Sequence, residues 1–226
     1  MAEISLSPSP IMKNLTLRQI FDKHLSLLAD KWSSYFDVYE TFFSKYRDQK
    51  PVIVEVGIQG GGSMQMWKAY FGEGAKIYGI DIDKGVQNLP LEGVHITIGD
   101  QSSPEFWVDF LKDIEPIDCF IDDGGHTMTQ QILTLQMAWP KIKDGGVYIC
   151  EDTHTSYWGK FGGGLESPDS FISFSKRLID LIHCEHFGGG ATQEQLPFND
   201  LGSIHFFNSQ VVLIKGKPLF SRVFND

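Results

Sequence analysis

The chain has 226 residues, a formal net charge of −10 and 42% hydrophobic residues. This length suits one well-buried α/β domain, and an acidic chain without a basic run argues against nucleic-acid or anionic-membrane partners. No stretch approaches 18 consecutive apolar residues, and the first ten, MAEISLSPSP, lack the basic and apolar regions of a signal peptide. We therefore expect a soluble, cytoplasmic protein with a small-molecule partner, and the sequence leaves both a monomer and a homo-oligomer open.

The N-terminal quarter predicts an arm followed by two helices. Residues 1–14 are polar and read as a flexible arm ahead of a single domain over 15–226, whose first part, 15–50, is a helical preamble. Thr16 and Gln19 have the spacing of a capping box, which predicts a helix start. A second helix is expected from Tyr35 to Tyr46, with an aromatic stripe that favours core or interface packing over cofactor binding.

From Pro51 onward, short apolar runs end in acids or glycines, and each is followed by helical periodicity. This alternation is typical of βαβ units, so we predict a Rossmann-like, doubly wound, mostly parallel sheet with helices on both faces. Two later runs predict an antiparallel pair at the sheet edge. The predicted strands are VIVEVG (52–57), KIYGIDID (76–83), VHITIGD (94–100), CFIDD (119–123), GVYICED (146–152), SIHFF (203–207) and VVLIKG (211–216).

Smaller signals mark helix starts, loops and cysteines. Ser103-Pro104 and Ser167-Pro168 both fit an N-cap followed by proline at the first helical position. Glycine clusters at 162–164 and 188–190 bracket one helix and predict flexible loops, with a lid as the second interpretation. The three cysteines lack metal-ligand spacing and are expected to be buried free thiols; they are Cys119, Cys150 and Cys184.

The predicted strands end in a series of acids. In doubly wound sheets, ligands bind outside the carboxyl ends of the strands, so these acids are expected to share one rim. No Lys or Arg stands directly among them in the sequence, and close like charges repel, so the crevice should attract positive charge. At Asp83 and Asp100 a loop or cap role is equally favoured. The acids are Glu55, Asp81, Asp83, Asp100, Asp122, Asp123, Glu151 and Asp152.

The first strand-to-helix turn, 55–63, is rich in glycine and suits a nucleoside ligand. A dinucleotide fingerprint would need glycine where Gln59 stands. Asp81 follows the second strand at a position suited to ribose hydroxyls. Because a pyrophosphate would enter an acidic rim, the charges favour S-adenosylmethionine, which brings an ammonium and a cationic sulfonium.

The segment FIDDGGHTMTQQI, residues 120–132, places acids, glycines and a histidine before a predicted helix. Thr127 and Gln130 form a capping box there, which explains the threonine but not His126. Asp122 and Asp123 are adjacent on an extended segment, so their side chains should point to opposite sides. One could then meet a cofactor and the other an ion.

Together these residues resemble a known family. EVGIQGGGSMQMW (55–67), GIDID (79–83), GDQ (99–101), DDGGH (122–126) and EDTH (151–154) are similar to the class I methyltransferases related to the mycinamicin and macrocin sugar O-methyltransferases. That group also includes cephalosporin-hydroxylase-like proteins. The resemblance covers roughly residues 30–216, and the pairing of DxxH with a later ED is its most specific part.

The resemblance implies a role for each matched residue. The methionine and ribose parts of S-adenosylmethionine would contact Glu55, Gly57, Gly61, Gly62 and Ser63, with Asp81 on the ribose and Asp100 and Gln101 on the adenine side. Asp122 would face the cofactor. A divalent metal would be held by Asp123, Glu151 and Asp152, with His126 as the catalytic base. Acceptor binding is suggested for His154, Tyr157 and Trp158.

Three carboxylates without a thiolate suit a hard ion, Mg²⁺ first, then Mn²⁺ or Ca²⁺. The leading prediction is therefore a metal-dependent O-methyltransferase of natural product biosynthesis, acting on a sugar, catechol or other vicinal-diol hydroxyl. Two alternatives stay open, another acceptor class and a non-catalytic S-adenosylmethionine-binding protein. A less favoured one is a non-heme iron oxygenase using His126, His154 and one carboxylate.

Overall fold

The computed structural model describes residues 14–186 and 197–216. The predicted arm, except for its last residue, and the second glycine cluster at 188–190 lie outside these ranges. No helix of the described residues is long and apolar enough to cross a membrane.

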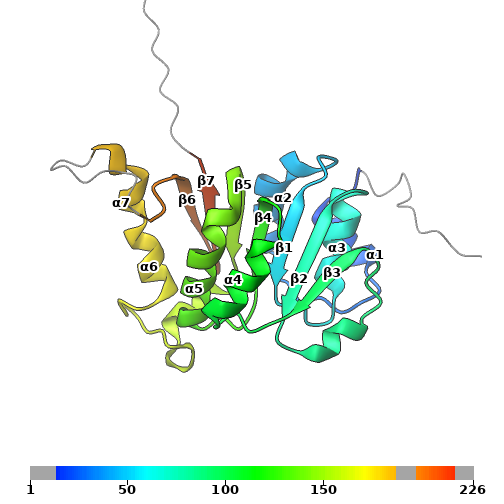
Figure 1. The fold of residues 1–226 in the computed structure, drawn as a ribbon, viewed down its shortest axis with the longest axis horizontal. Helices are drawn as coiled ribbons and strands as arrows, with labels where there is room; N and C mark the ends of the chain where they lie inside the picture. The colour runs from blue at the N-terminus through cyan, green and yellow to red at the C-terminus, as the bar shows by residue number, and fades with distance from the viewer. Residues whose placement is uncertain (1–13, 187–196, 217–226) are drawn as a thin grey trace, which may run out of the picture.

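A seven-stranded sheet forms the centre of the fold, in the order β3-β2-β1-β4-β5-β7-β6 (Figure 1). The first five strands are parallel, and β7 pairs antiparallel with both β5 and β6. This confirms the predicted doubly wound sheet with an antiparallel C-terminal pair. The strands are β1 (Val52–Val56), β2 (Lys76–Asp81), β3 (Val94–Ile98), β4 (Ile117–Asp122), β5 (Ile142–Cys150), β6 (Leu201–Phe207) and β7 (Gln210–Lys215).

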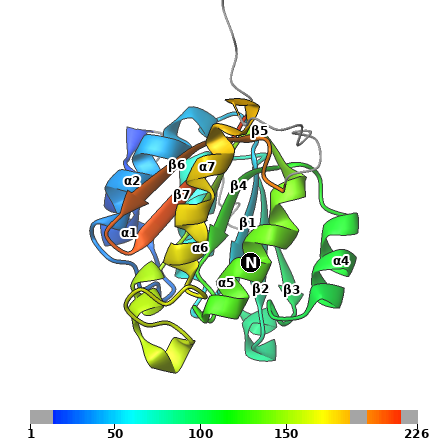
Figure 2. The ribbon, with the colours of Figure 1, turned by 90° about the vertical axis from the view of Figure 1, so that its left-hand side faces the viewer.

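Helices cover both faces of this sheet (Figure 2). On one face lie α1 (Leu17–His24), α2 (Tyr35–Phe43) and α3 (Gly62–Phe71), and on the other α4 (Pro104–Lys112), α5 (Met128–Ala138) and α6 (Phe171–Arg177), with the short α7 (Ile179–Ile182) after α6. Short 3₁₀ helices are η2 (Ser44–Tyr46), η3 (Lys84–Asn88), η4 (Trp139–Lys141), η5 (Thr153–Tyr157), η6 (Gly159–Phe161) and η7 (Cys184–His186).

Most predicted helix starts are confirmed, and one is wrong. Thr16 and Thr127 form capping boxes, and Ser103 caps α4. The expected start at Ser167-Pro168 is instead a turn, in which Ser170 N donates to Ser167 O (3.3 Å). Helix α6 begins only at Phe171, because the Ser170 hydroxyl accepts a hydrogen bond from the amide of Ser173.

The aromatic stripe of α2 packs in the core as predicted, with Tyr35, Tyr39 and Phe43 almost fully buried. The cysteines of the described residues are free and buried, as expected.

Alternation along the strands decides which face each terminal acid meets. Residues 119 and 121 of β4 pack with α1–α3, whereas residue 120 packs with the opposite helices. The same alternation along β1 and β5 aims Glu55, Asp123 and Glu151 toward the α1–α3 face and Asp122 toward the other. Strands β4 and β5 are neighbours, which the predicted metal site required.

Candidate active site

A cavity of about 630 Å³ lies outside the carboxyl ends of the strands. It is lined by the turn after β1, the ends of β2–β5, and part of the segment that joins α1 to α2. This is where a ligand of a doubly wound sheet binds. The predicted residues that line it are Gly57, Ser63, Asp81, Asp83, Asp100, Gln101, Asp123, His126, Glu151 and Asp152.

The turn after β1 is fixed by one glycine and one carboxylate. Gly57 has φ of +93°, and a Cβ there would lie 2.0 Å from the backbone oxygen of Asp123. Only glycine therefore lets the turn approach the end of β4 this closely. Asp81 Oδ2 accepts hydrogen bonds from the amides of Ile58 (2.9 Å) and Gln59 (3.1 Å), so the residue expected to bind ribose also shapes the turn.

Gly61 and Gly62, which were expected to contact the donor, do not line the cavity and instead lie against the segment before α2. The amide of Gly62 donates to Leu28 O at 2.9 Å, and a Cβ on Gly62 would lie 2.6 Å from Leu27 O. These glycines therefore admit a neighbouring backbone in this structure, and the segment 26–32 passes over the first turn of α3.

On the predicted adenine side, Asp100 and Gln101 have separate local roles. Hydrogen bonds from the hydroxyl and amide of Ser102 lower the pKa of Asp100. The side chain of Gln101 is buried, donates from Nε2 to Asp122 Oδ1 (3.1 Å) and accepts from the amide of Gly125 at Oε1 (2.7 Å). Gln101 therefore ties the end of β4 to the glycines that follow it.

Asp122 does not face the cavity, which corrects the expectation that it would meet the cofactor. Its side chain points to the α4–α6 face, where Tyr148 Oη donates to Oδ2 at 3.0 Å. Burial raises the pKa of Asp122 to about 7, although hydrogen bonds from Tyr148 and Gln101 lower it. The alternation of Asp122 and Asp123 was predicted correctly, but the side reached by Asp122 is protein interior.

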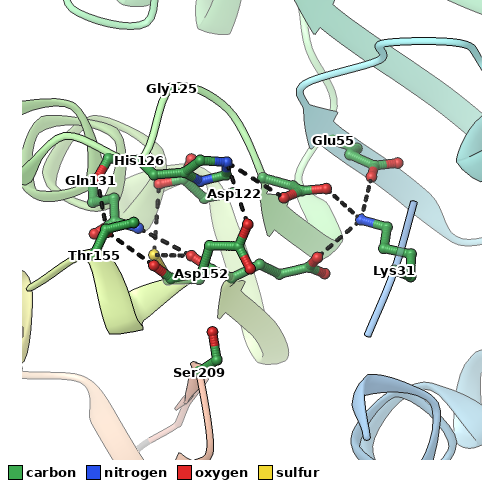
Figure 3. Close-up of polar contacts among 12 residues, drawn as sticks. Lys31, Glu55, Asp122, Gly125, His126, Gln131, Asp152, Thr155 and Ser209 are labelled. Carbon is green, nitrogen blue, oxygen red and sulfur yellow. Dashed lines mark hydrogen bonds and ion pairs between the residues drawn. The ribbon is translucent and has the colours of Figure 1, made fainter. Parts of the chain in front are cut away.

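The lysine side chain of Lys31 brings a positive charge into this group of acids, and the sequence analysis did not identify it. Lys31 Nζ lies 2.6 Å from Asp123 Oδ2, 2.9 Å from Glu151 Oε2 and 3.0 Å from Glu55 Oε1, and its side chain is 2% exposed (Figure 3). Burial lowers the pKa of Lys31, but the carboxylates, Asp123 foremost, more than offset it and raise the pKa above its ordinary value. Lys31 thus supplies part of the positive charge that these acids were expected to attract, from a segment outside the strand ends.

The two glutamates of this ion network are fully buried and have further partners. Glu55 Oε2 accepts a hydrogen bond from Trp67 Nε1 at 2.5 Å, and Glu151 Oε1 accepts one from Tyr39 Oη. Burial raises the pKa of both carboxyl groups, and Lys31 lowers it. Glu55 does not line the cavity, so its predicted contact with the donor is not seen in this geometry.

A second cluster lies on the outer side of Asp123. One ligand atom each of Asp123, His126 and Asp152 lies within 4.8 Å of the others. His126 Nε2 is 3.5 Å from Asp152 Oδ2 and 4.0 Å from Asp123 Oδ1. His126 Nδ1 is buried and has no hydrogen-bond partner among the described residues.

His126 and Asp152 both have positive φ, 57° and 52°, a conformation that non-glycine residues adopt chiefly where surrounding structure enforces it. Tyr35 Oη donates to the other oxygen of Asp152 at 2.6 Å and fixes its carboxylate. The carboxylates of Asp123 and Asp152 offer hard oxygen ligands that fit a divalent ion such as Mg²⁺ or Mn²⁺, and the His126 imidazole lies beside them.

The three predicted acceptor residues do not line the cavity, but His154 contacts Trp32, which does. The His154 ring stacks on Trp32 at 5.3 Å and meets Trp158 at 4.6 Å, while its Nδ1 lies 2.6 Å from Ser209 Oγ. Trp32 lines the cavity and is 47% exposed; Trp158 is 46% exposed. Trp32 was missed because no periodicity or motif surrounds it in the sequence.

Comparison with known proteins places this fold in a class. Residues 54–153 match the family described as methyltransferase domain. The sheet order, the antiparallel C-terminal strands and this match define a class I methyltransferase fold. The resemblance to sugar O-methyltransferases, expected from the motifs, is confirmed.

Three relatives show which group within the class is similar. The 8-demethyl-8-alpha-L-rhamnosyl tetracenomycin-C 2'-O-methyltransferase of Streptomyces olivaceus is 36% identical over 190 residues, covering 79% of this chain and 50% of that protein. The mycinamicin VI 2''-O-methyltransferase of Micromonospora griseorubida is 35% identical over 156 residues, covering 64% and 38%. The structure of the MycE methyltransferase in complex with Mg, SAH and mycinamycin VI has a TM-score of 0.78 at 26% identity, covering 93% of this chain and 55% of that one. The chain thus spans about half the length of the first relatives it matches.

Proposed function

We propose that this protein transfers the methyl group of S-adenosylmethionine to a sugar hydroxyl, assisted by a divalent ion. One observation carries the proposal: a single cavity joins the glycine turn and Asp81 to two carboxylates that suit an ion, Asp123 and Asp152, and to the His126 imidazole beside them. A nucleoside donor and an ion-assisted hydroxyl can then meet in one space.

Donor binding is assigned to the turn after β1. Asp81, which orders that turn, is placed to accept hydrogen bonds from ribose hydroxyls, and Ser63 lies at the start of α3 on the same wall. The acids that line the cavity favour a donor with a cationic sulfonium over one with a pyrophosphate.

The ion is assigned to Asp123 and Asp152, with Glu151 as the third carboxylate. When bound, it supplies positive charge that lowers the pKa of an alcohol, as metals do for water. His126 takes the hydroxyl proton at Nε2 as general base. The acceptor oxygen then forms a bond to the methyl carbon while the bond between that carbon and sulfur breaks. The electron pair of the broken bond stays on sulfur, so the donor leaves as a neutral thioether.

Binding of the acceptor is assigned to the aromatic side chains near the ion site, those of Trp32, His154 and Trp158. Trp32 stacks on the His154 ring and Trp158 meets it edge-on, and both tryptophans are about half exposed. Such rings bind the apolar faces of a sugar or of its aglycone. The names of the similar proteins, which are O-methyltransferases of glycosylated natural products, support this acceptor class.

Two alternatives have less support. A facial triad for non-heme iron needs two imidazoles. Among the described residues, the cluster that could hold a metal ion contains one imidazole, that of His126. A non-catalytic donor-binding protein would keep the glycine turn but would not need the strained His126 beside two carboxylates.

The test is methyl transfer from labelled S-adenosylmethionine to a panel of deoxysugar glycosides and catechols, before and after EDTA treatment. We expect transfer to a glycoside that EDTA abolishes and Mg²⁺ or Mn²⁺ restores. Asp152→Asn should lose transfer while donor affinity changes by less than about tenfold, or roughly 1.4 kcal/mol.

The matched control is Asp30→Asn, which removes the same charge from an exposed residue of the cavity rim and should keep its activity. Full activity after exhaustive chelation would refute the ion-assisted mechanism. Donor binding without transfer to any acceptor, at every ion tested, would support the non-catalytic alternative.

A further inference from the structure

Lys31 shares its carboxylates with the assigned ion site. Its ammonium contacts Asp123 and Glu151, which are two of the three carboxylates assigned to the ion. A divalent ion and an ammonium that approach the same oxygens repel each other, the more so because Lys31 and Glu151 are almost fully buried. The two cations therefore cannot both take their full set of contacts.

The contacts show where the conflict lies. Asp123 gives Oδ2 to Lys31, while Oδ1 faces His126, so this carboxylate has one oxygen on each side. Both oxygens of Glu151 accept hydrogen bonds, Oε1 from Tyr39 Oη and Oε2 from Lys31 Nζ. An ion held by Asp123 and Asp152 gains Glu151 only when the ammonium withdraws from Oε2.

We propose that Lys31 is a positioning residue that takes the place of the divalent ion between Asp123 and Glu151, and that ion binding displaces its ammonium from Glu151. The inference rests on the ion site of the proposed function. When no ion is bound, the Lys31 ammonium offsets the repulsion among Glu55, Asp123 and Glu151, of which the two glutamates are fully buried. Its presence also lowers the affinity of the site for the ion.

The segment that carries Lys31 supports movement of the side chain rather than of the backbone. Leu28 O accepts from the amide of Gly62, and the amides of Ser26 and Leu27 both donate to Gln65 Oε1 at 3.1 Å. These bonds hold the backbone of residues 26–28, just before Lys31, against α3. The four-carbon stem of a lysine lets its ammonium shift while the backbone stays.

The experiment is a calorimetric titration of the full chain with Mn²⁺. Lys31→Met should bind Mn²⁺ at least about tenfold more tightly than the unmutated protein, because the competing charge is gone. Lys31→Arg restores a cation and should bind no more tightly than the unmutated protein. Lys160→Met is the control, since the Lys160 ammonium lies over the Trp158 and Phe161 rings; it should leave the affinity unchanged.

Melting temperatures give a second measurement. Lys31→Met should melt lower in EDTA, because buried acids face one another without the ammonium, and Mn²⁺ should raise its melting temperature more than that of the unmutated protein. Should this variant fail to fold, Lys31→Met combined with Glu55→Gln removes one charge of each sign. The double variant should still bind Mn²⁺ more tightly, which a change of net charge alone cannot explain.

The outcomes are distinct. Equal or weaker Mn²⁺ affinity in a folded variant without Lys31 overturns the competition and leaves the proposed function intact. An absence of Mn²⁺ binding in every protein, the unmutated one included, overturns both the competition and the ion site of the proposed function.

Discussion

Two parts of the site are built in different ways. We call the turn after β1, residues 57–63 with Asp81, the donor turn, and the cluster of Lys31, Asp123, His126, Glu151 and Asp152 the ion corner. In the donor turn, Asp81 orders amides only 22 and 23 residues before it, and the approach to β4 depends on one glycine. In the ion corner, Lys31 contacts residues 92 and 120 positions further along the chain. The hydrogen bonds of the first region join two consecutive strands, whereas those of the second also join residues far apart in the sequence.

This difference predicts how each region responds to mutation. A local turn loses hydrogen bonds of moderate strength when one residue changes. A corner that concentrates charge and a general base controls the chemical step, so a change there affects turnover more than binding. Three variants test this difference between the two regions.

The largest effect is expected for His126→Ala. Loss of a general base lowers turnover by a factor on the order of 10²–10⁴, while donor binding is unchanged because His126 does not contribute to the turn after β1. Steady-state kinetics and donor titration measure the two quantities separately.

The matched control is His95→Ala, since the His95 ring stacks on Tyr78 at 4.9 Å, on a strand at the opposite edge of the parallel part of the sheet. Mn²⁺ titration adds a second readout. If His126→Ala abolished Mn²⁺ binding, His126 would be an ion ligand and no longer the proposed base. Retained turnover would leave it without a catalytic role.

A smaller effect is expected for Asp81→Ala, this time on binding. Removing a carboxylate that accepts charge-assisted hydrogen bonds should weaken the donor by roughly 1.5–3 kcal/mol in calorimetry. Asp83→Ala is the control, because Asp83 lies on the same rim but its side chain caps η3 through the amide of Gly85. Equal losses in both variants would show that the donor senses the charge of the rim rather than Asp81.

The sequence predicted the fold because its periodicity is local. Each apolar run before an acid became a strand, and the alternation of side chains correctly separated Asp122 from Asp123. The start of β5 was placed at residue 146 instead of Ile142, because the polar residues 143–145 hide the first part of that strand.

The ion corner was predicted only in part, and the physical reason is distance along the chain. The acids were found because strand ends meet at one edge. Lys31 and Trp32 were missed because their partners are set by how the segment before α2 crosses α3, which no motif encodes. Glu55 was placed near the correct neighbours, but its contact with Trp67 depends on the packing of α3.

The smallest effect is expected for Thr127→Ala, at the residue next to His126. The Thr127 hydroxyl accepts from the amide of Gln130, whose side chain accepts from the amide of Thr127, so this capping box begins α5. Its loss should cost about 1 kcal/mol of unfolding free energy. For a chain of this size, that lowers the melting temperature by roughly 2–4 °C.

Thr16→Ala is a matched control, because Thr16 and Gln19 form the same capping box on α1. The two variants should lose similar stability and keep their donor affinity. If Thr127 serves only the helix start, both should also keep their turnover. A hundredfold loss of turnover in Thr127→Ala alone, at equal stability, would mean that the α5 cap holds the strained His126 in position. The corner would then depend on its helix as strongly as the donor turn depends on Asp81.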